Sequence, residues 1–349
     1  MIQIKLQTIS GIDGLDLSEW EKIWNGVAPN ADLNAFIELL VSVEGIDGIS
    51  ILEFIAELAI KAFKENIGAY SIFIAITLLS GIVGLISSND DGVGKAAEFM
   101  CFGIAAGIGI KILTSMISLA INTINQMNAA METITPVLAV VLAGTGSTVA
   151  GTLLQPASSF ISMSTVVVFK NMVLPAILAA GIVAAYSGFA GSSAGMFGLF
   201  KSAVKWLMGA VFAVYFGIVA IQGITVARAD SIALRTARYT IDRSIPIVGG
   251  AVSGSLDSIL ASTSLIKDAA GAAGAATAVA VALSPLINVA CAGLCCRAAA
   301  ALCEPLGNKQ ISVFLSRMAE VMNMLFAVVT AVAIMFIMAM GLTFAAGNP

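Results

Sequence analysis

The sequence predicts an all-α integral membrane protein, a polytopic bundle of about seven or eight transmembrane helices. Of its 349 residues, 59% are hydrophobic and only 11% are charged, whereas soluble domains carry about 25% charged residues. Apolar stretches of about 20 residues, the length that crosses the hydrocarbon core of a bilayer, recur from residue 67 onward. The chain also holds 33 Gly, and small residues are common where transmembrane helices touch. Lipid is therefore the predicted solvent for most of the chain.

Residues 1–66 differ in character from the rest of the chain. They hold far more acids than lysines, and their apolar residues recur at helical spacing. We expect an acidic N-terminal headpiece of short amphipathic helices that Gly45 and Gly48 interrupt. No typical secretory signal is visible here, so either the first membrane helix targets the chain or a leader lies upstream.

The remainder, residues 67–349, is predicted to be a multi-pass membrane domain. Seven stretches are long and apolar enough to span: 67–87, 97–121, 134–154, 171–190, 203–225, 272–294 and 318–346. Two further stretches, 156–169 and 244–266, carry Pro or Gly breaks and are predicted to be re-entrant or broken helices, or an extra span. Such backbone survives at membrane depth only where protein buries it or water reaches it.

The segment between residues 223 and 274 combines spaced charges with a Pro–Gly break. One interpretation is an amphipathic helix that lies along the membrane, and an equally good one is a cytoplasmic loop whose arginines fix the topology. The charged residues of this segment are candidate contacts for partner proteins: Arg228, Asp230, Arg235, Arg238, Asp242, Arg243 and Asp257.

Lys111 lies near the middle of the predicted span 97–121. An unpaired Lys at the bilayer centre costs about 2.5–3.5 kcal/mol on insertion scales, and such residues face a bundle interior, a water cavity or an acidic partner. The alternative is a shifted span whose Lys reaches the interface. We favour the first interpretation, so Lys111 is the leading candidate for lining a polar interior. Nearby, the pattern Gly103–x3–Gly107 with Gly109 predicts close helix packing within the chain.

The sequence argues against several other classes of function. It has no His, which removes the commonest general base and zinc ligand, and no nucleophile–base pair is suggested. The stretch NDDGVGKAA lacks the first Gly and the Ser or Thr of a phosphate loop. The cysteines (Cys101, Cys291, Cys295, Cys296 and Cys303) fit no metal or disulfide pattern and are predicted to be buried apolar residues or acylation sites. We expect no enzyme, cofactor, metal or nucleic-acid function.

Several stretches resemble a known family. ARADSIALRTARYTIDRSIPIVGG and SGSLDSILASTSLIKDAAG resemble the signature region of the stage III sporulation protein AE family, and LLQPASSF (153–160) and NMVLPAILAAG (171–181) resemble its earlier blocks. Order and spacing agree over roughly residues 66–346. Family members generally begin with an export signal, which is not visible here.

The resemblance implies an endospore-forming bacterium. It also implies a membrane component of the multiprotein secretion channel between mother cell and forespore, in the mother-cell membrane around the forespore. The role would be that of a permease-like or scaffold subunit, with a separate ATPase and ring-forming proteins as partners. Association with further copies of the same chain is also compatible with the resemblance. The alternative from a different class is an independent secondary transporter of a small solute; with no phosphate loop, ATP-driven work would have to come from another protein.

Overall fold

The computed structural model describes residues 48–86, 92–144, 163–190 except 165, 195–218, 281–306 and 308–345, and the single positions 220 and 279. Helix is the dominant secondary structure of these residues, which contain no strand, so the all-α prediction is confirmed. Within this part of the chain, 6 helices are long and apolar enough to cross a membrane. They are Ile60–Gly84, Gly92–Ala129, Val166–Gly188, Gly195–Ile218, Val281–Cys303 and Gln310–Ala339.

The first two helices are longer than the sequence analysis expects. Helix α4, Gly48–Ile86, is continuous, so the expected boundary between headpiece and membrane domain at residue 66 is not a break in the helix. Helix α5, Gly92–Gly144, likewise runs through the expected gap between 121 and 134. Residues 122–133 are polar but contain neither Gly nor Pro, and polarity alone does not end a helix. The expected stretch 244–266 lies outside the described residues, as do residues 1–47 of the expected headpiece, the second half of the expected span 134–154 and the start of the stretch 156–169. The first half of 134–154 is the end of α5, and residues 166–169 belong to the span Val166–Gly188.

The remaining spans are offset from their expected positions. A π-helical turn, η1 (Phe169–Val173), leads into α7, Leu174–Ala190. The next spans are the 195–218 helix and the 281–303 helix, and a 3-10 turn, η2 (Glu304–Leu306), precedes α10, Lys309–Ala345. The bounds of these last three spans place charged residues inside them. The expected spans kept such charges at or beyond their edges, because charges are costly in lipid. In the structure Arg297 and Glu320 line a polar groove, and Lys205 is exposed.

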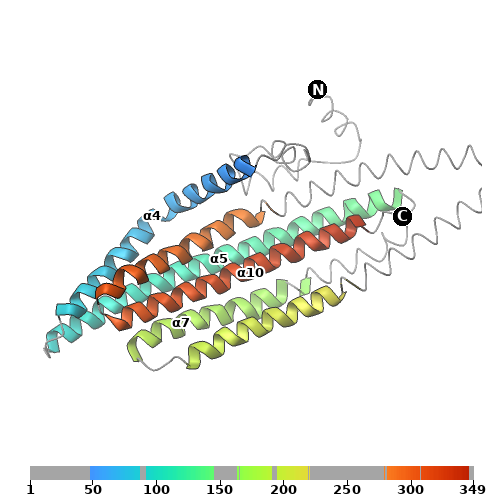
Figure 1. The fold of residues 1–349 in the computed structure, drawn as a ribbon. Coiled ribbons are helices and arrows are strands. Elements are labelled where there is room, and N and C mark those ends of the chain that lie inside the picture. Colours follow the sequence, from blue (N-terminus) through green and yellow to red (C-terminus); the bar gives the residue numbers. More distant parts are fainter. Residues whose placement is uncertain are drawn as a thin grey trace, which may run out of the picture.

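The described helices lie in antiparallel pairs, and in each pair the end of the first helix and the start of the second lie at the same end of the bundle (Figure 1). The pairs are α4 with α5, α7 with the 195–218 helix, and the 281–303 helix with α10. We call this end, at the lower left of Figure 1, the turn end. Helix α10 is the most deeply buried span and packs against α5 and α7. Its inward side chains include Phe314, Met318 and Leu325, which have no exposed surface.

Two glycines let α7 lie close to its neighbours. A Cβ at Gly181 would overlap Leu113 of α5, and one at Gly188 would overlap the Phe102 ring and lie 3.3 Å from the backbone oxygen of Gln310. Of the three α5 glycines that were expected to pack against other helices, only Gly109 does so, against Phe314. A Cβ at Gly103 or Gly107 would have nothing within 4 Å. Those two therefore face outward, contrary to the expectation of packing within the chain.

Asn308 ties three helices together at the turn end. Its side-chain oxygen accepts hydrogen bonds from the backbone N–H groups of Gln310 (3.1 Å) and Ile311 (3.3 Å), so it caps the N-terminus of α10. Its amide nitrogen donates to Glu98 Oε1 of α5 at 2.9 Å and to the Ser80 carbonyl of α4 at 3.5 Å. One side chain thus fixes the start of α10 relative to α4 and α5.

Replacing Asn308 with Ala is expected to lower the free energy of unfolding by about 1–2 kcal/mol, the usual cost of losing an N-cap. The loss also leaves Glu98 without a donor. Unfolding in detergent micelles, followed by circular dichroism, measures the effect. Asn323→Ala is the matched control, because Asn323 is exposed on the same helix. Equal stability of the two variants would show that the junction contributes nothing.

Candidate functional site: a charged groove between two spans

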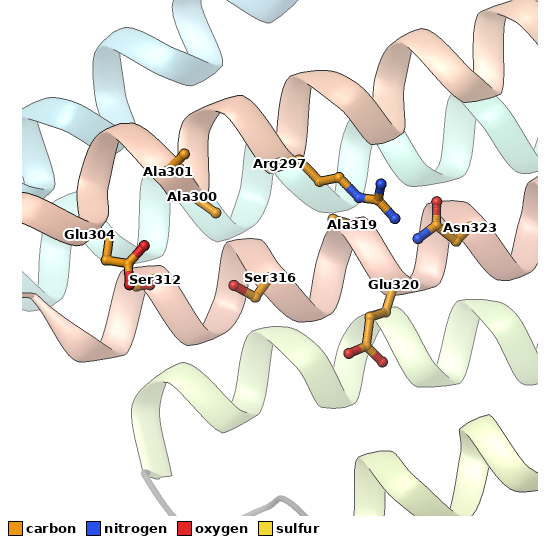
Figure 2. A pocket seen from close by; sticks show the side chains of 9 residues that line it. All are labelled: Arg297, Ala300, Ala301, Glu304, Ser312, Ser316, Ala319, Glu320 and Asn323. Carbon is orange, nitrogen blue, oxygen red and sulfur yellow. The ribbon is translucent and has the colours of Figure 1, made fainter.

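A polar groove of about 390 Å³ lies between the 281–303 helix and α10 (Figure 2). On α10 the polar positions recur every three or four residues, so they share one helix face. The lining residues are Arg297, Ala300, Ala301, Glu304, Ser312, Ser316, Ala319, Glu320 and Asn323. The groove therefore follows a polar face of an otherwise apolar helix.

The charged side chains of the groove point in different directions. In Figure 2 the guanidinium of Arg297 points across toward Asn323, whereas Glu320 points away from the 281–303 helix. Glu320 Oε2 instead accepts from Lys201 Nζ of the 195–218 helix at 2.5 Å. Within the described residues, Arg297 and Glu304 form no ion pair. The groove thus presents one cation and one anion that its own walls do not neutralise.

A second charged residue of α10 also contacts the 195–218 helix. The guanidinium carbon of Arg317 lies 5.4 Å from the centre of the Phe197 ring, a cation–π contact. Together with the Lys201–Glu320 ion pair, it attaches the outer helix to α10 through polar groups. Lys201 and Glu320 keep 36% and 44% of their side chains exposed, so solvent weakens their attraction.

Glu320 lies well inside its span. At a rise of about 1.5 Å per residue it stands about 16 Å along α10 from Lys309, near the middle of a hydrocarbon layer about 30 Å thick. A charged side chain at this depth faces a protein partner or water. The groove is therefore suited to receive a polar segment of another protein or a column of water.

The chemistry of the groove is that of recognition. Its lining offers a guanidinium, two carboxylates, a carboxamide and two hydroxyls. Among the described residues, no group of three or more Cys, Asp or Glu side chains is placed to hold a metal ion. The five cysteines are free, and Cys295, Cys296 and Cys303 are buried among apolar neighbours.

The residues singled out from the sequence lie elsewhere. Lys111 is on the exposed side of α5, outside the buried core, and its ammonium forms no ion pair within the described helices. That it lines a polar interior stays a prediction, and such an interior would lie between this chain and its neighbours. The other candidates lie outside the described residues: Arg228, Asp230, Arg235, Arg238, Asp242, Arg243 and Asp257.

Lys201, Arg297 and Glu320 were not among the site residues predicted from the sequence. A signal for Glu320 was present, because it is the only acid in the predicted span 318–346. It also follows Ser312 and Ser316 at helical spacing. Arg297 and Lys201 gave a weaker signal, since the predicted spans ended or began beside them.

Comparison with known proteins identifies a family. The family model of stage III sporulation protein AE matches residues 32–347. The chain is 22% identical over 357 aligned residues to stage III sporulation protein AE of Bacillus subtilis (strain 168), covering 99% of this chain and 89% of that protein. No solved structure matches the chain. Because the family model covers most of the sequence, including every described span, the chain belongs to the stage III sporulation protein AE family.

Proposed function

We propose that the protein is a membrane subunit of the multiprotein channel that links mother cell and forespore during sporulation. Its place would be the mother-cell membrane around the forespore, as a permease-like or scaffold subunit. Family membership supports the sporulation role, and six apolar helices of spanning length support the membrane location. Ring-forming proteins and a separate ATPase would be its partners, as the family resemblance implies. The ATPase would be a separate protein because the sequence carries no phosphate loop.

The observation that carries this proposal is the open charged groove between the 281–303 helix and α10. A charged side chain inside a membrane span is costly in lipid and faces protein or water. Arg297 and Glu304 have no ion-pair partner within the described chain, although Arg297 lies in a span. A protein that worked alone in lipid would gain by closing such a groove. A subunit that meets other proteins uses it for contact.

Gene deletion and complementation in the sporulating host test the proposal. Deletion is expected to leave vegetative growth unchanged and to lower the number of heat-resistant spores by orders of magnitude, and the wild-type gene should restore it. A tagged wild-type chain should copurify with channel subunits from sporulating membranes. The double variant Arg297→Ala, Glu304→Ala should no longer copurify with these channel subunits.

Glu65→Gln is the matched control, since Glu65 is exposed on α4 away from the groove. It should sporulate and copurify as the wild type does. Normal spore counts after deletion would refute the sporulation role. Solute uptake by liposomes that contain this chain alone would refute the subunit role and favour a secondary transporter.

A further inference from the structure

From residue 105 to residue 132 the outward face of α5 is polar, whereas nearer the turn end the same helix exposes Phe99, Met100 and Ile104. Between residues 105 and 132, every described side chain that is exposed is polar, charged, Gly or Ala. We call this surface the α5 polar face. Its residues are Gly107, Lys111, Thr114, Ser115, Ser118, Asn122, Asn125, Gln126, Ala129 and Glu132.

Other spans of the same bundle expose large apolar side chains. Ile182 of α7 is 52% exposed, Trp206 of the 195–218 helix is 73% exposed, and Leu294 of the 281–303 helix is 62% exposed. Such side chains are suited to contact lipid tails. The α5 polar face is therefore not a lipid-facing surface of the usual kind.

Contacts with α7 place this face in the membrane. Leu113 lies against Gly181, inside the span Val166–Gly188, so Lys111 and Ser115 lie at the depth of that span. From Gly107 to Glu132 the helix rises about 38 Å, more than the roughly 30 Å of the hydrocarbon core. The polar face is therefore long enough to cross the hydrocarbon. Near its far end, Lys170 of η1 donates to Asn125 Oδ1 at 3.4 Å and adds another cation.

The charge of Lys111 limits what can lie against the α5 polar face. Lipid would leave its ammonium without hydration or a counter-ion. A second α5 packed symmetrically against it would bring two lysines together, and like charges repel strongly where water is excluded. Water satisfies the ammonium and also the neighbouring hydroxyls and carboxamides. Small residues such as Gly107 and Ser118 leave room for it.

We propose that in the assembled protein the α5 polar face lines a water-filled path across the membrane, with Lys111 as a cationic point at mid-depth. The inference rests on the proposed function and deepens it, since it says which surface of the subunit faces the path. The apolar faces of the other spans remain toward lipid, and the groove on α10 remains the surface for partner proteins.

Thiol labelling in membranes from sporulating cells tests this path. Single cysteines are introduced as Ser115→Cys, Ser118→Cys and Asn122→Cys in a chain whose five native cysteines are replaced by Ala. If that cysteine-free chain does not support sporulation, the cysteines are introduced into the wild-type chain, and the labelling rate of the wild type is subtracted. The reagent is sulfonatoethyl methanethiosulfonate, a small anion that does not cross lipid. Ile182→Cys is the control for a lipid-facing residue at similar depth, and Ala120→Cys for a buried residue on α5 itself.

The three polar-face cysteines are expected to react about tenfold faster or more than both controls, because the thiolate that reacts forms in water and not in lipid. Rates as slow as that of Ile182→Cys would overturn the proposal, since the face would then be covered by lipid or protein. Spore counts of each variant are read in parallel. Unreactive cysteines in a chain that sporulates normally would reject the path while leaving the subunit role intact.

Discussion

Gly188→Ala is expected to destabilise the protein, whereas the same substitution at Gly209 is expected to stabilise it slightly. A Cβ at Gly188 would overlap the Phe102 ring and approach the Gln310 backbone, but a Cβ at Gly209 meets nothing within 4 Å. Ala in place of Gly stabilises a helix interior by about 1 kcal/mol. Overpacking a close contact costs about 1–3 kcal/mol. The clash at Gly188 should therefore outweigh the helix gain and separate α7 from α5.

Thermal unfolding in detergent measures the two variants side by side. The double variant Gly188→Ala, Phe102→Leu provides a further control, because the smaller side chain makes room for the new methyl group. Its loss of stability should be smaller than the sum of the two single losses, the sign of direct coupling. If Gly188→Ala were as stable as Gly209→Ala, the close approach of α7 and α5 would be wrong.

The charge of Lys111 is expected to select between anionic and cationic reagents at Ser115→Cys. Residues 111 and 115 are one helical turn apart, and two unit charges about 6 Å apart in water interact with about 0.7 kcal/mol. The sulfonate reagent is attracted and the trimethylammonium reagent is repelled. Their rate ratio, after normalisation to a free thiol, should favour the sulfonate by about tenfold at low salt.

Charge variants at residue 111 supply the control. Lys111→Gln should bring the normalised ratio close to one, and Lys111→Glu should reverse it. Raising the ionic strength should reduce the preference, because salt screens charges that water reaches. A ratio that is unchanged by Lys111→Gln would mean that this ammonium does not act on the path.

Composition and the lengths of apolar runs were enough to predict an all-α membrane protein, because lipid is the only solvent that suits so few charges. The boundaries of the individual spans were harder to predict. Spans were predicted to exclude Glu320 and Arg297 or to place them at an edge, yet both lie within helices on a polar groove. Residues 122–133 were predicted to separate two spans, yet they continue α5, since Asn and Thr without Gly or Pro do not break a helix.

The orientation of Lys111 could not be predicted from the sequence. Its helix is apolar on several sides, so periodicity does not say which side meets α4, α7 and α10. That choice depends on close contacts such as Leu113 with Gly181, which involve residues far apart in the chain. For the same reason the Lys201–Glu320 pair, which joins the fourth and sixth described spans, was invisible before the fold was known.

Helix α5 has 53 residues, and this length fixes how far apart the groups attached along it can lie. At about 1.5 Å per residue the helix is about 80 Å long, so with about 30 Å in the hydrocarbon a large part of it stands clear of the lipid. A group attached to the part of α5 beyond the hydrocarbon is held at a distance from the bilayer that the helix length sets. Each inserted residue would raise that attachment point by one helical step and turn it by about 100°.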